Sequence, residues 1–252
     1  MNGLDDTLWE RLAAARHVVV FTGAGMSAES GVPTFRDAQT GLWQRYNPAD
    51  LATPEAFERD PGLIWRWYAW RRELMAEVQP NAGHEAVARL QDRVARVTVA
   101  TQNVDGLHQR AGSDNVLELH GSLHRIICSR EHLEVRDPVP AESDDEPPRC
   151  PQCAAPLRPA VVWFGEALPE GAWHAAMRAA GEADVLLSVG TSGLVQPAAS
   201  IPMMALEQGA AVVEINPEPT PISEQVTASI RGTAAGVLPG IVDRLSSRSN
   251  RS

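Results

Sequence analysis

Short apolar runs, each ending in small or polar residues, recur along the chain. They cover residues 17–21, 97–100, 183–190 and 211–216 and are rich in Val, Leu and Ala. Strands of a parallel sheet that is buried on both faces have this nearly continuous apolar character. Segments with helical spacing lie between the runs, so the pattern predicts an α/β fold with a parallel sheet.

Three segments show the spacing of an amphipathic helix. The N-terminal segment places Leu4, Leu8 and Leu12 on one face, and residues 81–95 form a second helix in which we expect His84 to pack or cap. In residues 61–78 the inward stripe is predicted at Leu63, Trp67, Trp70, Leu74 and Val78.

Polar side chains follow two of the predicted strands. Gln102, Asn103 and Asp105 come after the second strand, and His120 ends the next apolar run. In open α/β sheets, ligands bind beyond the carboxyl ends of the strands. Any one of these residues alone could be a capping or turn residue. Two amides, a carboxylate and an imidazole together indicate a candidate site.

A glycine turn follows the first predicted strand. Gly23 and Gly25 allow backbone conformations that a Cβ atom would forbid, and a short helix is expected from Ser27. A diphosphate could then approach the amide N–H groups at the start of that helix. The turn lacks the GxGxxG spacing of an ordinary dinucleotide fold and could be only a tight turn. Downstream, Phe35 offers a flat apolar face and Arg36 a cationic fork.

Composition narrows the function classes. The 252 residues are 44% hydrophobic, which allows a real core, and no run is apolar and long enough to span a bilayer. The N-terminal segment lacks the features of a secretory peptide, so we expect a cytoplasmic protein without a membrane partner. The formal net charge of −10 argues against nucleic acid as the main ligand and leaves room for a cationic partner, such as a lysine-bearing peptide.

Six stretches carry a more specific pattern: GAGMSAESGVPTFR, TQNVDGLH, LELHG, VVWFGE, GTSGLVQPA and EINPEP. In this order and spacing they resemble the sirtuins, the NAD-dependent protein lysine deacylases. The resemblance implies a Rossmann-like NAD-binding domain of residues 1–34, 81–122 and 160–252, with helices on both faces of its sheet. It also implies a small domain from two insertions, residues 35–80 and 123–159, one helical and the other metal-binding and zinc-ribbon-like.

The resemblance also implies roles for individual residues. His120 matches the general base, and Asn103 would orient water and the ribose. An extended acyl-lysine peptide would add a strand along Val162, Trp163, Phe164 and Gly165. The residues that would bind NAD are Gly23, Ala24, Gly25, Phe35, Arg36, Gln102, Asn103, Asp105, Gly190, Thr191, Ser192, Asn216, Pro217, Glu218 and Ala234.

Tyr68 and Arg71 are three residues apart and therefore share a helix face. Such a pair could be a surface stacking or charge pair. It also resembles the acyl-pocket pair of the sirtuins that prefer acidic acyl groups. Arg71 can bind a carboxylate through two parallel hydrogen bonds, and the Tyr68 hydroxyl can add another. The resemblance thus implies that succinyl- or malonyl-lysine is a better substrate than acetyl-lysine.

Three cysteines are a poor disulfide framework, and the spacing of Cys150 and Cys153 favours a metal or redox pair. The zinc module of the sirtuins has two CxxC pairs, of which this chain keeps the second and, at Cys128, half of the first. Tetrahedral zinc needs four ligands. The fourth could be Glu131, which stands where the fourth cysteine would be, the adjacent His132, or water; weak or absent metal binding is the alternative.

The implied reaction consumes NAD. The acyl oxygen attacks the anomeric carbon of the nicotinamide ribose, nicotinamide leaves, and His120 helps a ribose hydroxyl to attack the acyl carbon. Water then completes the transfer, and the products are lysine, nicotinamide and O-acyl-ADP-ribose. A mono-ADP-ribosyltransferase that uses the same NAD site, or a non-catalytic NAD-binding module, are the alternatives. We expect a monomer.

Overall fold

The computed structural model describes residues 4–32, 47–143 and 145–249. Its centre is a parallel sheet of six strands in the order β3-β2-β1-β6-β7-β8, which confirms the predicted fold class. The strands are β1 (His17–Thr22), β2 (Arg96–Thr101), β3 (Val116–Glu118), β6 (Val185–Val189), β7 (Ala211–Asn216) and β8 (Ala228–Arg231). The edge strand β8 is short and only partly buried, and no apolar run marked it in the sequence.

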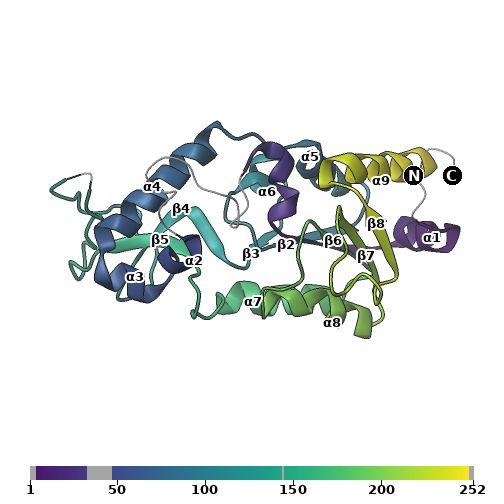
Figure 1. Cartoon of the computed structure of the whole chain (residues 1–252). Coiled ribbons are helices and arrows are strands. Elements are labelled where there is room, and N and C mark those ends of the chain that lie inside the picture. Colours follow the sequence, from purple (N-terminus) through teal and green to yellow (C-terminus); the bar gives the residue numbers. More distant parts are fainter. Residues whose placement is uncertain (1–3, 33–46, 144, 250–252) are drawn as a thin grey trace.

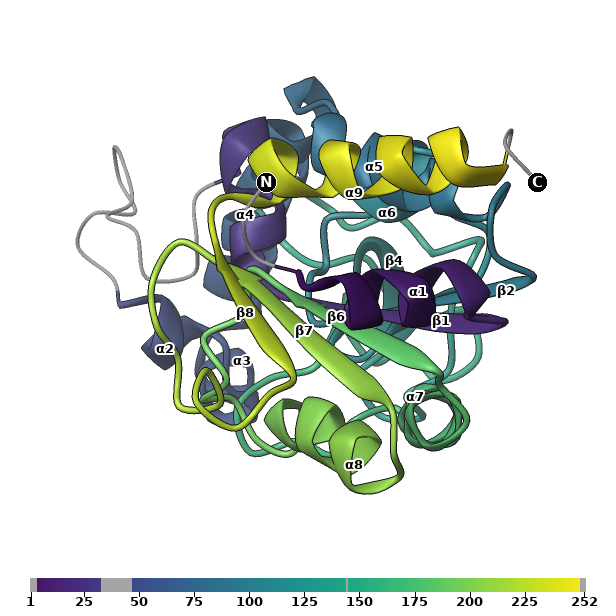
Figure 2. The ribbon, with the colours of Figure 1, turned by 90° about the vertical axis from the view of Figure 1, so that its right-hand side faces the viewer.

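Helices cover both faces of this sheet (Figure 2). One face carries α1 (Asp6–Ala14), α5 (Ala82–Leu90) and α9 (Ala234–Ser249), and the other carries α7 (Glu170–Gly181) and α8 (Ile201–Glu207). Along β1, Val18 and Val20 pack against the first set of helices and Val19 and Phe21 against the second. This alternation follows from the two-residue period of a strand.

A second group of elements lies at the opposite end of the molecule from α1 (Figure 1). It contains the helices α2 (Pro48–Leu51), α3 (Pro54–Arg59) and α4 (Pro61–Glu77), and the antiparallel pair β4 (Gly121–Cys128) and β5 (Leu157–Val161). Thr53 and Asp60 cap α3 and α4, and each is followed by a proline that suits the first turn of a helix. The helices pack on the strand pair through a common apolar cluster.

Several local predictions were wrong. The buried face of α4 holds Ile64, Trp67, Tyr68 and Met75, whereas Leu74 is 37% exposed. Trp67 lies on the predicted stripe, and Leu63, Trp70 and Val78 are partly buried against the same cluster. The prediction was therefore wrong at Leu74 and missed Ile64, Tyr68 and Met75. The apolar run that begins at Arg158 predicts a return to the parallel sheet, but it belongs to β5, which pairs with β4 instead.

Two helix boundaries also differ from the prediction. The helix expected to run to residue 95 ends at Leu90, and Asn81 and His84 form the capping box that starts it, which confirms the expected capping role of His84. The polar composition of residues 246–252 predicts a disordered tail, but α9 continues as far as Ser249. In the described part of the chain, no helix combines the length and the apolar character needed to cross a membrane.

Candidate functional site

The turns after β1 and β6 meet at the carboxyl end of the sheet. A Cβ atom on Gly23 would lie 2.9 Å from the carbonyl oxygen of Gly190, and one on Gly25 would lie 2.8 Å from the Gly190 Cα. Gly190 itself has φ +60°, and a Cβ there would lie 2.4 Å from the Met26 nitrogen. The glycines are therefore required for close backbone packing between two neighbouring strand ends.

Glycine is needed at positions 23 and 25 for a different reason from the backbone conformation that was predicted. Neither has a positive φ. The short helix expected from Ser27 is present as a 3₁₀ turn, Ala28–Ser30, with Ser27 as its N-cap, and another 3₁₀ turn, Ala24–Met26, precedes it. The N–H groups of the two glycines are also used within the protein, since Gly23 donates to Val189 O at 3.1 Å and Gly25 to Gly190 O at 2.8 Å. The two turns are thus locked together before any ligand binds.

A polar network links the strand ends to Asp105. The Asn103 amide donates to Gly23 O at 3.0 Å and to Ser27 Oγ at 3.1 Å. Ser27 in turn donates to Asp105 Oδ2 at 2.7 Å, and Asp105 Oδ1 accepts from the Leu107 N–H at 2.9 Å. Asp105 is 5% exposed. Because both carboxylate oxygens are bonded internally, Asp105 holds Ser27 and Asn103 in place.

The network includes two buried histidines that sequence reasoning did not assign to the site. His84 Nδ1 accepts from the Asn81 N–H, so Nε2 carries the proton toward Ser27 Oγ, 3.4 Å away. His108 Nε2 lies 3.1 Å from Thr22 Oγ1, and the two imidazoles are in edge contact at 4.9 Å. Burial lowers the pKa of His84 to about 4 and that of His108 to about 3, so both are neutral near neutral pH.

A sequence signal for the two histidines did exist. His84 stands three residues after Asn81, the spacing of a capping box, and His108 belongs to the polar stretch after β2. Neither spacing shows that the two side chains meet, because contact between α5 and the segment after β2 is set by tertiary packing.

His120 lies beside the same strand ends. Its Nδ1 is 3.1 Å from Gln102 O, and a carbonyl oxygen only accepts, so Nδ1 carries the proton and Nε2 keeps the lone pair. Gln102 is itself fixed, because its amide donates to Thr191 Oγ1 at 3.0 Å. Burial is the largest influence on the His120 pKa and lowers it, so that the imidazole is in its basic form near neutral pH.

Further residues that are predicted to bind NAD lie at the ends of β6 and β7 and at the start of α9. Thr191 Oγ1 accepts from the Gly193 N–H, Asn216 donates from its side chain to Glu218 O, and Ala234 begins α9. Glu29 accepts from the Ala235 N–H at 2.8 Å, so part of the first turn of α9 is already capped. Of the other predicted residues, Ser192 and Pro217 lie in these turns, while Phe35 and Arg36 fall outside the described residues.

The predicted substrate segment is a turn beyond β5 and not an edge strand. The Val162 N–H donates to His120 O at 2.9 Å and the Phe164 N–H to Ala52 O at 2.9 Å. Gly165 takes φ +89°, which explains why glycine follows Phe164 here. The segment therefore bridges His120 on the sheet side and the helices on the other side, and Phe164 is 52% exposed.

An ion pair that the sequence reasoning overlooked anchors this turn. Arg158, 4% exposed on its side chain, bonds both oxygens of Glu166 at 2.5 and 2.8 Å and also Val161 O. Burial alone would raise the pKa of Glu166, but the bonds from Arg158 and from the Trp163 N–H hold it below its usual value. A charged residue inside the apolar run of β5 was the signal for this pair.

Tyr68 and Arg71 both lie on the inner side of α4. Tyr68 is fully buried, and its hydroxyl accepts from Trp163 Nε1 at 2.9 Å. The Arg71 guanidinium lies 5.1 Å from the Trp67 ring centroid and 5.6 Å from that of Tyr68. Burial lowers the Arg71 pKa, and the nearby Tyr68 and Asp105 only partly oppose this effect. Among the described residues, none forms a salt bridge with Arg71.

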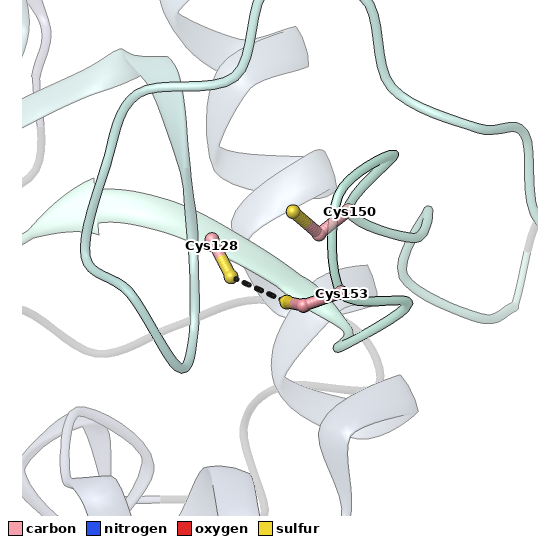
Figure 3. A group of neighbouring side chains, drawn as sticks. All are labelled: Cys128, Cys150 and Cys153. Atoms are coloured by element: carbon pink, nitrogen blue, oxygen red, sulfur yellow. Dashed lines mark hydrogen bonds between the residues drawn. The ribbon is translucent and has the colours of Figure 1, made fainter.

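The three cysteines come together at the C-terminal end of β4. Their sulfurs all lie within 4.8 Å of one another, and Cys128 Sγ is 3.4 Å from Cys153 Sγ (Figure 3). Thiolates around a tetrahedral zinc are about 3.8 Å apart for Zn–S bonds of about 2.3 Å. The donor set and its spacing therefore fit a structural zinc ion. The Glu131 carboxylate and the His132 ring are not within this group of ligand atoms in the described structure.

The loops that carry these cysteines have the same backbone construction. In one, Cys128 O accepts from the His132 N–H and the Cys128 N–H donates to Leu133 O. In the other, Cys150 O accepts from the Ala154 N–H and the Cys150 N–H donates to Ala155 O. His132 and Ala154 both have φ +56°. The equivalence places Glu131 at the position that Cys153 occupies in the second loop.

Comparison with known proteins agrees with this arrangement. A model of the Sir2 family matches residues 23–197. An NAD-dependent protein deacylase of Pseudomonas aeruginosa is 55% identical over 241 residues, which cover 93% of this chain and 96% of the relative. A Sir2 homologue in complex with NAD has a TM-score of 0.88 at 44% identity and covers 97% of this chain and 95% of its own.

A mutant Sir2 homologue in complex with 2′-O-acetyl ADP-ribose is equally similar, with a TM-score of 0.88, 44% identity, and coverage of 97% of this chain and 98% of its own. Sequence and fold thus agree over nearly the whole length. The chain belongs to the Sir2 family, the family of the sirtuins.

Proposed function

We propose that this protein removes succinyl and malonyl groups from lysine in preference to acetyl groups. As a member of the Sir2 family it is an NAD-dependent protein deacylase. The preference for acidic acyl groups is the finer statement, and it is supported by the chemistry of Arg71 and Tyr68 on the inner side of α4.

The supporting observation is the uncompensated charge of Arg71. A cation removed from water is costly unless a counter-charge and hydrogen bonds replace the lost solvent. Arg71 has aromatic faces beside it but forms no salt bridge with any described residue, and both oxygens of the nearby Asp105 accept bonds from other groups. An acyl chain that ends in a carboxylate would supply a negative charge through a bidentate hydrogen bond to the Arg71 guanidinium. An acetyl group would leave Arg71 as it is.

His120 is proposed as the general base. Its Nε2 holds the lone pair, and Gln102 O fixes the tautomer and the ring orientation. When bound, NAD supplies the anomeric carbon that the acyl oxygen attacks and the ribose hydroxyl that accepts the acyl group. Removal of the hydroxyl proton by His120 would make that oxygen nucleophilic.

The polar network is proposed to orient the reacting groups. Asn103 has both amide donor bonds directed to Gly23 and Ser27, so its side-chain orientation is fixed. Asp105 acts on the nicotinamide side through Ser27 and Asn103. The turns at Gly23–Gly25 and Gly190–Ser192, with the ends of β7 and α9 at Asn216–Glu218 and Ala234, are proposed to hold the rest of NAD.

The cysteine cluster is proposed to hold a structural zinc ion through Cys128, Cys150 and Cys153. Glu131 is the proposed fourth ligand, because its loop is the structural equivalent of the loop that presents Cys153. The ion would tie the loop after β4 to the loop before β5 and take no part in the reaction.

Product analysis tests the proposed function. Purified protein would be mixed with NAD and peptides of one sequence that carry acetyl-, malonyl- or succinyl-lysine, and the products identified by mass spectrometry. We expect nicotinamide and O-acyl-ADP-ribose, with the acidic acyl groups transferred faster. ADP-ribosylated protein in place of O-acyl-ADP-ribose would show that the reaction is ADP-ribosyl transfer, and faster deacetylation would overturn the preference.

A further inference from the structure

We propose that Trp163 is a specificity-determining residue, because its indole N–H fixes the Tyr68 hydroxyl as a hydrogen-bond donor toward the acyl group. This inference rests on the proposed preference for acidic acyl groups. It assigns to Trp163 a role that differs from lining the path of the peptide backbone.

The direction of the hydrogen bond carries the argument. Trp163 Nε1 can only donate, so at 2.9 Å the Tyr68 oxygen must accept. A hydroxyl has one proton and two lone pairs. The Tyr68 oxygen accepts from the indole and also from the Arg71 guanidinium, which can only donate. The hydroxyl proton remains available to a further partner. A carboxylate only accepts hydrogen bonds, so this arrangement suits an acidic acyl group, whereas an acetyl methyl group offers it no acceptor.

The indole of Trp163 is itself held on several sides. The Arg158 guanidinium lies 3.3 Å from its ring centroid, and the Phe57 ring centroid is 5.3 Å away. Arg158 is bonded to both oxygens of Glu166, and Glu166 also accepts from the Trp163 backbone N–H at 2.8 Å. With backbone and ring both fixed, the indole N–H points at Tyr68 in the absence of any ligand.

The bond is more than the routine pairing of a buried N–H group. Trp67 and Trp9 have buried indole nitrogens with no hydrogen-bond partner among the described residues. The fold therefore accommodates unbonded indole N–H groups at two other positions, one of them on the same helix as Tyr68. At Trp163 the N–H is instead directed to the hydroxyl that lies next to Arg71.

A double-mutant cycle tests the proposal. Trp163→Phe removes the N–H but keeps an aromatic ring, Tyr68→Phe removes the hydroxyl, and the third variant combines them. The measured quantity is the ratio of kcat/KM for succinyl-lysine to that for acetyl-lysine in peptides of one sequence. Because a hydrogen bond to a charged group contributes about 1.5–3 kcal/mol, we expect Tyr68→Phe to lower the ratio by about 10- to 100-fold. We expect Trp163→Phe to lower it by about 5- to 10-fold, mainly through the succinyl KM.

Non-additivity separates orientation from packing. In the Tyr68→Phe background, Trp163→Phe should change the ratio by less than about twofold, because the hydroxyl that it orients is already gone. The matched control is Trp9→Phe, which also removes a buried indole N–H group. The Trp9 ring likewise has an arginine over it, with Arg244 at 4.1 Å from the ring centroid, but Trp9 belongs to α1. It should leave the ratio unchanged.

Two results would overturn the inference while the proposed function stands. In the first, Trp163→Phe has the same succinyl-to-acetyl ratio as the wild-type protein. In the second, Trp163→Phe lowers the ratio by the same factor whether or not the Tyr68 hydroxyl is present. If the wild-type protein itself has a succinyl-to-acetyl ratio of one or below, the proposed preference for acidic acyl groups is overturned. If Trp163→Phe does not fold, the indole ¹⁵N–¹H signal of Trp163 in the wild-type protein replaces it. That signal should shift when succinyl-lysine peptide binds and stay in place with acetyl-lysine peptide, and the opposite pattern contradicts the proposal.

Discussion

At the ends of the parallel strands (the sheet side of the site) the polar groups bond to one another, whereas on the inner side of α4 (the α4 side) Arg71 forms no salt bridge with any described residue. Asn103, Ser27 and Asp105 form a closed set of hydrogen bonds at the ends of parallel strands. Arg71 lies beside the Trp67 and Tyr68 rings, shares a hydrogen bond with the Tyr68 hydroxyl and has Asp105 nearby. The sheet side is therefore built before ligands bind, and under the proposed function the substrate would complete the α4 side.

The largest effect is expected at the reacting centre. His120→Ala removes the base, and general base catalysis contributes about 10²- to 10⁴-fold. We expect a loss of this size in the formation of O-acyl-ADP-ribose. Thermal unfolding should change little, because the imidazole is partly exposed and makes one hydrogen bond, to Gln102 O. A variant that keeps most of its activity would show that another group takes the proton.

Metal removal is expected to affect the α4 side more than the sheet. The cysteine cluster holds the loops around β4 and β5, so a chelator should lower the midpoint of thermal unfolding by about 2–4 °C for each kcal/mol of stability lost. Zinc content by elemental analysis checks the metal itself.

Glu131 gives the matched pair of variants for this site. Glu131→Cys adds a fourth thiolate at the equivalent loop position and should slow the loss of zinc to a chelator, whereas Glu131→Ala should accelerate it. Identical rates of zinc loss in wild type and Glu131→Ala would exclude Glu131 as a ligand.

Acid should destabilise the sheet side through its buried histidines. In the unfolded chain a histidine takes up a proton near pH 6.5, but burial holds the pKa of His84 at about 4 and that of His108 at about 3 in the fold. Between these values the unfolded state binds more protons, so stability falls as the pH is lowered below about 6.5. The slope is at most about 1.4 kcal/mol per pH unit for each histidine.

Thermal unfolding from pH 7.5 to 4.5 measures this slope. His108→Leu should flatten the profile, because the titrating group is gone while the buried volume remains filled. His174→Leu is the matched control, since His174 is an exposed histidine on α7, and it should leave the slope as it is in the wild-type protein. If the stability of His108→Leu depends on pH as that of the wild-type protein does, the neutral His108 imidazole is not the cause of the acid destabilisation.

The sheet side could be predicted from the sequence and the α4 side much less so. Apolar runs that end at Gln102 and His120 determine where a parallel sheet collects polar groups, because all its strands end at one edge. The stripe predicted on α4 was right at Trp67 and largely right at Leu63, Trp70 and Val78, but it included the exposed Leu74 and missed Ile64 and Met75 on an adjacent face, because both faces fit a helical spacing. Only packing on Trp163 decides between the two faces, and that contact joins residues far apart in the chain.

Side chains that act through tertiary contacts were missed for the same reason. The spacing of Ser27, His84 and His108 along the chain does not reveal that they share one network. The glycines at positions 23 and 25 were identified, but for the wrong cause, since the obstacle to a Cβ atom is the backbone of Gly190, which follows a strand about 165 residues later.

The comparison between the two sides depends most on Arg71, which forms no salt bridge with any described residue. The direct measurement is a competition in one tube between succinyl- and acetyl-lysine peptides of the same sequence, with NAD, for wild type, Arg71→Met and the adjacent control Arg72→Met. Wild type and Arg72→Met should form O-succinyl-ADP-ribose first, and Arg71→Met should lower the ratio of succinyl to acetyl product by about 10- to 100-fold, the effect of losing a charge-assisted bidentate bond. An unchanged ratio in Arg71→Met would contradict the account.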